Sequence, residues 1–252
     1  MIQGLYAAAN GMVSIEDRQS VFANNIANAS TPGFKRQIPI QQGYYEAFFA
    51  ETQHASRFNL ERGPGGGPKL NETFSDFGDG ILSTTGNPLD VALVGPAFAV
   101  VETPDGDRYT RDGKFAVNVD GDLVNSQGFR VLDTGGAPIR VNGPNVEIDS
   151  DGNVTADGQV AGTLQLVEFE DPHMLDREGF TLWAASPEAI QRSGPAEKTI
   201  VTSHALEMSN VQIPNEIGQM MMALRAYGAN QQVIQAIDET VSRLIDQVGA
   251  PG

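Results

Sequence analysis

Residues 206–248 read LEMSNVQIPNEIGQMMMALRAYGANQQVIQAIDETVSRLIDQV, and apolar side chains recur in this segment at alternating steps of three and four. The recurring residues are Ile217, Met220, Leu224, Tyr227, Ile234, Val241, Ile245 and Val248. Such a heptad stripe predicts one long amphipathic helix. Pro214 and Glu216 favour a helix N-terminus there, and Gly249 and Pro251 end the pattern. The stripe has no apolar partner nearby in the sequence.

A second stripe occupies the N-terminus, residues 1–29. Its members are Leu5, Ala8, Met12, Ile15, Phe22 and Ile26. We expect a helix that stops near Asn28, because Pro32 disfavours helical conformation in the residue before it. The two stripes are natural partners within one chain, and other subunits are their natural partners beyond it. Pairing that only closes the domain and polymerisation through the same helices both agree with this periodicity.

Between the two helices the sequence consists of short β-prone runs separated by turns. The runs are Leu89–Leu93, Ala97–Glu102, Lys114–Val119, Phe129–Leu132, Ala137–Val141, Val146–Ile148 and Thr163–Phe169. Asp-Gly pairs lie among them at 105–106, 112–113, 120–121, 151–152 and 157–158. An Asp-Gly pair flanked by such runs is a strong hairpin signal. The middle of the chain is therefore predicted to be a compact antiparallel β-domain.

The expected fold class is α+β, with the terminal helices paired as a coiled-coil-like stem beside a central antiparallel β-domain. Residues 37–80, which hold the Gly/Pro tract at 63–68, read as an extended connector. The expected divisions are an assembly helix and turn at 1–36, the connector at 37–80, the β-domain at 81–205 and a second assembly helix at 206–252.

Composition excludes several classes of function. The 252 residues carry 16 basic and 32 acidic side chains, a net charge of −16, which argues against a nucleic-acid partner. Without cysteine, the chain has no disulfide scaffold, thiolate zinc site or cysteine nucleophile. No run reaches the roughly 18 apolar residues of a membrane span. Early acidic residues, Glu16 and Asp17, argue against a cleaved secretory signal.

The charge is unevenly distributed along the chain. Residues 37–205 carry a net charge of −14, whereas both ends are nearly neutral. This division is expected if the ends form an interface and the middle faces water. We therefore predict that the residues of both stripes form an assembly interface.

No motif in the sequence indicates catalysis or a bound cofactor. The segment Asp149-Ser150-Asp151-Gly152-Asn153 begins like a calcium loop, but valines stand where such a loop needs Gly and Glu, which favours a hairpin turn. Three histidines, His54, His173 and His204, are isolated and lack metal-ligand spacing. We expect no catalytic residue, cofactor, metal ion or small-molecule substrate. An extracellular calcium-dependent carbohydrate-binding β-protein is the alternative from another class, because acidic residues cluster in the middle.

The sequence of residues 24–36, NNIANASTPGFKR, closely resembles the N-terminal motif of the flagellar rod and hook protein family. In that family a heptad helix ends in Asn-Asn-(Leu/Ile)-Ala-Asn and a Thr-x-Gly-(Phe/Tyr)-(Lys/Arg) turn follows. The matching residues are Asn24, Asn25, Ile26, Ala27, Asn28, Thr31, Gly33 and Phe34. We expect Asn25 and Asn28 to bond nearby backbone and to tolerate a left-handed conformation at the helix end. Gly33 would relieve the turn, and Phe34 would anchor the chain.

Two further segments are similar to the same family. Residues 87–93, NPLDVAL, with residues 109–115, YTRDGKF, match its middle-domain pattern. Ser209-Asn210-Val211 and Arg225-Ala226-Tyr227 match its C-terminal helix. One departure is Gly95-Pro96-Ala97-Phe98-Ala99, where the family usually has Gly-x-Gly-Phe-Phe.

The resemblance implies a non-enzymatic structural subunit of the bacterial flagellar basal-body rod. It implies that the terminal helices line a hollow, torque-transmitting tube, with copies of the chain and other rod and hook proteins as partners. It also implies export through the flagellar type III apparatus to a periplasmic location, without a cleaved signal peptide. Residues 232–239 and 171–183 look most like the proximal rod. The distal rod is a close second, and a hook subunit is a further alternative.

Overall fold

The computed structural model describes residues 2–43 and 68–249. They form two compact units. The helical unit holds the described residues up to 27, those from 37 to 74 and those from 212 onward, and the β unit holds 28–36 and 75–211. Residues 44–67, which include His54 and most of the expected connector, lie outside the described residues. The turn after the first helix thus groups with the β unit, whereas it was expected to group with that helix.

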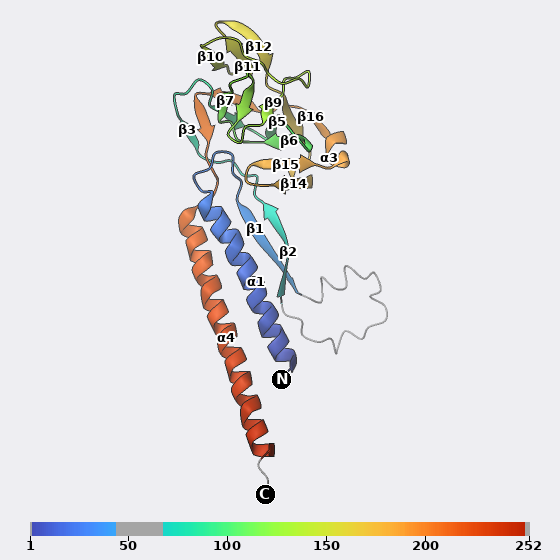
Figure 1. Cartoon of the computed structure of the whole chain (residues 1–252), viewed down its shortest axis with the longest axis vertical. Coiled ribbons are helices and arrows are strands. Elements are labelled where there is room, and N and C mark those ends of the chain that lie inside the picture. The colour runs from blue at the N-terminus through green and yellow to red at the C-terminus, as the bar shows by residue number, and fades with distance from the viewer. Residues whose placement is uncertain (1, 44–67, 250–252) are drawn as a thin grey trace. The chain divides into compact units, whose positions relative to one another are not determined.

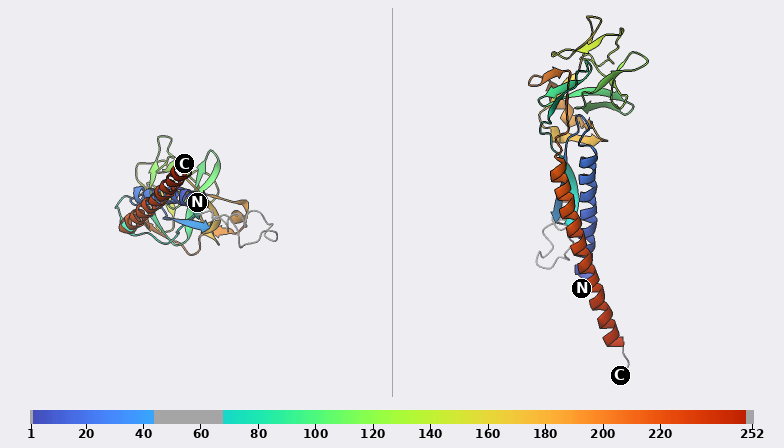
Figure 2. Two further views of the ribbon diagram at one scale, coloured as in Figure 1. Left: turned by 90° about the horizontal axis from the view of Figure 1, so that it is seen from below. Right: turned by 90° about the vertical axis from the view of Figure 1, so that its left-hand side faces the viewer.

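The helical unit contains both predicted helices, but the second was wrongly expected to begin at 206, since Ala205–Glu207 form a strand of the β unit. Helix α1 spans Ile2–Ala27 and α4 spans Ile213–Gly249. They lie side by side and run in opposite directions (Figures 1 and 2). Strands β1 (Gln37–Gly43) and β2 (Pro68–Ser75) pair in a two-stranded sheet, so both ends of the expected connector are strands. No helix among the described residues is long and apolar enough to cross a membrane.

The β unit is built from short strands joined by tight turns. Its strands are β3 (Leu82–Thr84), β4 (Val91–Val94), β5 (Ala97–Thr103), β6 (Gly106–Thr110), β7 (Phe115–Val117), β8 (Leu123–Asn125), β9 (Arg130–Val131), β10 (Val146–Ile148), β11 (Asn153–Ala156), β12 (Gln159–Thr163), β13 (Leu166–Phe169), β14 (Leu175–Glu178), β15 (Leu182–Ala185), β16 (Ser193–Pro195), β17 (Ile200–Ser203) and β18 (Ala205–Glu207). Two short helical turns complete it, η2 (Pro172–Met174) and α3 (Pro187–Gln191).

The strands of the β unit form one large sheet and three small ones. The main path runs β14-β15-β6-β5-β9-β8-β7, with β13 pairing both β5 and β16. Separate sheets are β10-β11-β12, β17-β4 and β18-β3. Pairing is antiparallel between the sheet neighbours β5 and β6, β10 and β11, and β17 and β4. The predicted antiparallel β-domain is confirmed, and the fold class is α+β.

Four of the five Asp-Gly pairs are hairpin turns. The clearest is Asp157-Gly158 between β11 and β12, where both residues have positive φ, 49° and 81°. The fifth pair, Asp112-Gly113, was wrongly expected to be such a turn. The Gly113 carbonyl accepts the N–H of Val91 at 2.9 Å, and a Cβ on Gly113 would overlap the Val91 carbonyl. This glycine allows two backbone segments to approach each other.

The predicted strand at 137–141 is wrong, since that run forms only isolated bridges. Leu132 pairs with Pro138, and Asp122 pairs with Arg140. Proline lacks the N–H that a continuous ladder requires.

One side-chain-closed turn occurs four times in the β unit. Its first residue is Asn118, Asn125, Asp133 or Asp149. In each turn the side-chain Oδ1 accepts the backbone N–H groups two and four residues later, at 2.8–3.0 Å. A glycine with positive φ occupies the fourth position. The segment at Asp149, which begins like a calcium loop, is one of these four turns.

The segment at Asp149 is therefore a hairpin turn, as predicted. Its carboxylate accepts hydrogen bonds from the Asn153 side chain and from the backbone of Asp151 and Asn153. These bonds, that of the Asn153 side chain above all, lower the pKa of Asp149. Across residues 2–43 and 68–249, no group of three or more His, Cys, Asp or Glu side chains could hold a metal ion.

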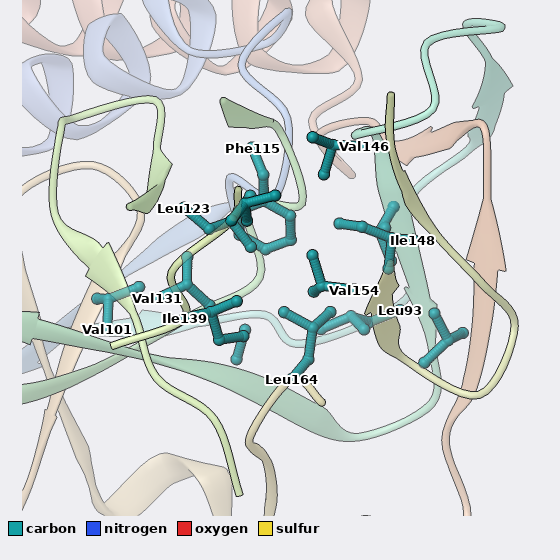
Figure 3. Packing of buried hydrophobic residues seen from close by; sticks show 14 of the residues in the cluster. Leu93, Val101, Phe115, Leu123, Val131, Ile139, Val146, Ile148, Val154 and Leu164 are labelled. Atoms are coloured by element: carbon teal, nitrogen blue, oxygen red, sulfur yellow. The ribbon is translucent and has the colours of Figure 1, made fainter. Parts of the chain in front are cut away.

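The β unit has a hydrophobic core of its own. Side chains from several strands and loops converge in it, among them Leu93, Val101, Phe115, Leu123 and Ile148 (Figure 3). A second cluster surrounds the fully buried Trp183, which packs edge-to-face on Phe98 with the ring centroids 5.5 Å apart. We therefore expect the β unit to remain folded when substitutions are made in α4.

Candidate assembly interface

Helices α1 and α4 pack along a narrow seam. On α1, the residues that face α4 across this seam are separated by seven residues or by a multiple of seven. The facing pairs are Gly4 with Ile237, Gly11 with Asn230, and Asn25 with Glu216. A Cβ at Gly4 would lie 3.6 Å from Ile237 Cδ1, and one at Gly11 would lie 2.9 Å from Asn230 Nδ2. As the residue number rises on α1, it falls by the same step on α4, so one antiparallel register holds over the whole seam.

Apolar contacts fill the seam between these pairs. Ile15 and Phe22 of α1 are buried against Ala223 of α4, with Met220 and Tyr227 partly buried beside them. Because α1 offers glycine at positions 4 and 11, the α4 side chains reach close to its backbone. The pairing within one chain, left open by the periodicity, is present in the structure.

The predicted stripe residues divide between the seam and the outside. Ala8, Ile15 and Phe22 are buried, and Met12, Ile26, Met220, Tyr227 and Ile234 are half-buried. Leu5, Ile217, Leu224 and Val241 are exposed, with Ile217 at 45% and Leu224 at 55%. The side chains of Ile245 and Val248 lie outside the described residues.

On both helices the seam is turned from the most apolar stripe by about 50°, half the angle between successive residues. At every second position of the predicted stripe, the residue that lies in the seam is the one before it in the sequence. Gly4 lies there in place of Leu5, and Ala223 in place of Leu224. Each helix, viewed from its own N-terminus, is turned in the same sense, and the two helices are antiparallel. Their most apolar stripes therefore face the same side of the helix pair. We call the apolar residues on that side the outer stripe: Leu5, Met12, Ile26, Ile217, Met221 and Leu224.

Helix α4 also continues past the start of α1, as Figures 1 and 2 show. In the register of the seam, Ile2 lies opposite residue 239. Residues 240–249 of α4 therefore extend beyond α1 by about 15 Å at 1.5 Å per residue. Val241 is exposed there because α1 has no residue to cover it.

In the helical unit the motif contributes Asn25, whose side chain is fully buried. Its Nδ2 donates to the Gln37 carbonyl at 2.8 Å and to Glu216 Oε2 at 3.0 Å. Its Oδ1 accepts the Gln37 N–H at 2.9 Å. One amide therefore holds the start of β1 and the first turn of α4. The expected bond to backbone is present, and a role toward α4 is added.

In the β unit the motif forms a tight turn. Thr31 donates its N–H to the Asn28 carbonyl at 3.1 Å and its hydroxyl to Asn28 Oδ1 at 3.2 Å. The left-handed conformation lies at Gly33 (φ 68°), so its expected place at the asparagines was wrong. Phe34 is fully buried, and the Arg177 guanidinium lies 4.3 Å from its ring centroid.

Gly33→Ala is expected to destabilise the β unit by about 3 kcal/mol or more, because a left-handed φ and a backbone overlap act together. The added Cβ would meet the backbone between Arg111 and Asp112. Gly86→Ala is the matched control, since Gly86 has a similar φ of 74° with nothing within 4 Å of its Cβ position. It should cost only about 1–2 kcal/mol. Urea unfolding measures both, and equal losses would show that the close approach has no effect.

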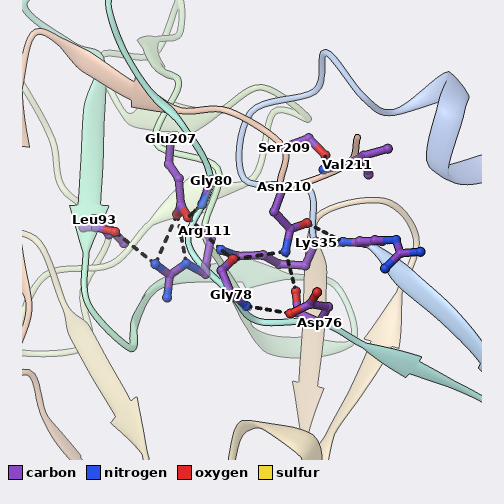
Figure 4. A network of polar contacts seen from close by, with 11 residues as sticks. Lys35, Asp76, Gly78, Gly80, Leu93, Arg111, Glu207, Ser209, Asn210 and Val211 are labelled. Carbon is purple, nitrogen blue, oxygen red and sulfur yellow. Dashed lines mark hydrogen bonds and ion pairs between the residues drawn. The ribbon is translucent and has the colours of Figure 1, made fainter. Parts of the chain in front are cut away.

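Three charged side chains are buried together in the β unit (Figure 4). Glu207 Oε1 accepts from Lys35 Nζ at 2.6 Å, and its Oε2 accepts from Arg111 Nε at 3.1 Å. The N–H of Gly80 completes the carboxylate's contacts at 2.8 Å. We call these three side chains the ion cluster. It joins the turn that follows α1 to β18, the last strand before α4.

The ion cluster shifts the pKa of two of its members. Burial alone would raise the pKa of Glu207, but the charges of Arg111 and Lys35, with hydrogen bonds from Gly80 and Lys35, lower it below its usual value. Burial, together with repulsion by Arg111, lowers the pKa of Lys35. Sequence reasoning missed this cluster because Glu207 is 172 residues from Lys35. The motif contained Lys35 but gave no indication of its partner.

Asn210 supports the same region. Its Oδ1 accepts the Arg36 N–H at 2.8 Å, and its Nδ2 donates to the carbonyls of Asp76 and Gly78 at 2.9 and 3.0 Å (Figure 4). The Ser209-Asn210-Val211 segment therefore holds backbone from the turn after α1 and from the segment after β2.

Three parts of the chain match known protein families. Residues 5–35 match the family described as Flagella basal body rod protein. Residues 92–156 match the Flagellar hook protein FlgE/F/G D1 domain, and residues 202–247 match the Flagellar basal body rod FlgEFG protein C-terminal. The first and last matches cover most of both helices of the seam and all members of the ion cluster except Arg111.

Whole-length relatives agree with these matches. The flagellar basal-body rod protein FlgG of Buchnera aphidicola subsp. Baizongia pistaciae is 32% identical, covering 97% of this chain and 99% of its own. The rod protein FlgF of Rhizobium meliloti is 30% identical, and the hook-basal body complex protein FlhO of Bacillus subtilis is 29% identical, each with 99% coverage of both chains. Together, the fold and these matches identify the chain as a structural protein. The chain belongs to the flagellar basal-body rod protein family.

Proposed function

We propose that this chain is a structural subunit of the flagellar rod that polymerises through the outer stripe and the extension of α4 beyond α1. The exposure of Ile217 and Leu224 beside an already closed seam is the observation that carries this proposal. A contiguous exposed apolar surface marks an interaction site more often than a solvated one. Burial of such side chains contributes about 25 cal/mol per Å² of apolar surface removed from water.

The partners in this proposal are copies of the chain and other rod and hook proteins. Intrachain pairing leaves one side of the helix pair apolar, and that side is available to the helices of a neighbour. Because every subunit carries the same surface, the contacts can repeat along an axis. Helices packed in this way would line a central channel and transmit torque mechanically, without catalysis.

The proposed location is the rod of the flagellar basal body, in the periplasm. We propose export through the flagellar type III apparatus with α1 retained. In support, α1 supplies half of the seam, so its removal would leave α4 without a partner. Two apolar surfaces would then be exposed in place of one.

We further propose the proximal end of the rod, because residues 171–183 and 232–239 resemble that group. Antibody labelling of isolated basal bodies tests this position. Label is expected on the rod, at the end nearer the export apparatus. Label on the distal rod would contradict the proximal position alone, whereas label on the hook, or none on basal bodies, would contradict a rod subunit.

A further inference from the structure

The seam between α1 and α4 buries the less apolar of two available faces. Turning each helix by about 50°, half the angle between successive residues, would keep Ile15 and Phe22 in the seam. It would replace Asn25 and Glu216 with Ile26 and Ile217, and Ala223 with Leu224. Hydrophobic burial alone favours the turned arrangement, because it removes more apolar area from water. Some other interaction therefore selects the observed rotation.

The side-chain amide of Asn25 makes three hydrogen bonds that depend on this rotation. It bonds both backbone groups of Gln37, which fixes the rotation of α1 against the start of β1. Its remaining donor reaches Glu216, a fully buried carboxylate in the first turn of α4. Turning α1 would break these three hydrogen bonds at once. Leaving buried polar groups unpaired costs about 1–3 kcal/mol each.

We propose that Asn25 is the positioning residue that sets the rotation of α1 and α4 and thereby keeps the outer stripe exposed for other subunits. A single buried polar pair can specify one helix arrangement over a more apolar alternative. Gly4 and Gly11 permit the observed packing, and Asn25 selects it. The functional consequence rests on the proposed polymerisation, whereas the rotation itself does not.

The absence of cysteine allows a direct test on the full-length chain at low concentration. Leu224→Cys and Ala223→Cys, made separately, report the two faces by their rates of reaction with a maleimide. Leu224 is 55% exposed and Ala223 only 2%, so the thiol at 224 should react at least about tenfold faster.

Asn25→Asp is the variant that tests the proposal. It removes the donor and places a second carboxylate against Glu216, with almost no change in shape. We expect labelling at 224 to slow and labelling at 223 to accelerate as the helices turn. Adding Glu216→Gln restores a donor–acceptor pair and should return both rates toward those of the starting chain. Gln232→Glu, the same change from amide to carboxylate at an exposed position of α4, is the matched control and should move neither rate.

Two results would overturn the proposal. If both labelling rates rise in Asn25→Asp, the amide only holds the helices together. If neither rate changes, the rotation is set elsewhere. These rates are measured without assembly, so a failure of polymerisation in another variant does not affect them.

Discussion

Leu224→Asp is expected to abolish rod assembly and motility and to leave the β unit folded. In the free chain this side chain faces solvent, so a carboxylate there costs little. In the proposed polymer it would be buried against another subunit, where an unpaired charge costs several kcal/mol at every repeated contact. Sedimentation of assembled material and swimming in soft agar measure the outcome.

Gln232→Asp is the matched control for Leu224→Asp. It adds the same charge at an exposed position of the same helix, outside the outer stripe. Normal assembly and motility are expected for this variant. Normal motility in Leu224→Asp would contradict the proposed interface, and equal loss in both variants would point to helix charge in general.

Glu207→Gln is expected to lower the free energy of unfolding of the β unit by about 3–5 kcal/mol, because it leaves Lys35 and Arg111 buried without their anion. Thermal or urea unfolding at neutral pH measures the loss. Glu178→Gln is the control, since its pair with Arg108 is about half exposed on the glutamate side and should contribute at most about 1 kcal/mol. Similar losses in the two variants would show that the ion cluster contributes no more to stability than the exposed Arg108–Glu178 pair.

The ion cluster also makes the free energy of unfolding depend on pH. The pKa of folded Glu207 lies below its unfolded value, so the unfolded state binds more protons between the two values. Its contribution is therefore complete above the unfolded pKa and is lost as the pH falls through the folded pKa. In Glu207→Gln the loss of stability on acidification should be shallower than in the parent chain.

Local features of the fold could be predicted from the sequence. The heptad stripes gave both helices, because periodicity depends on residues within one element. Four Asp-Gly hairpins were predictable for the same reason, since Asp and Gly adopt positive φ without distant partners. The prediction for Asp112-Gly113 was wrong because Gly113 allows its backbone to lie close to that of Val91. The identity of the two residues does not indicate this contact.

The rotation of the helices and the ion cluster could not be predicted. A stripe of apolar residues indicates which face is most hydrophobic, but Asn25 selects a neighbouring face through bonds to Gln37 and Glu216. Both partners belong to other elements. The Lys35–Glu207 pair likewise joins two ends of the chain. The contacts between subunits remain predictions based on the apolar residues that these bonds leave exposed.

A reconstruction of rods containing this subunit, at a resolution that shows side chains, would show directly whether the outer stripe forms the interface between subunits. We expect Ile217 and Leu224 of one subunit to be buried against the helices of a neighbour, with the α1–α4 seam retained inside each subunit. Rods in which the outer stripe faces solvent, and subunits contact each other only through their β units, would contradict it.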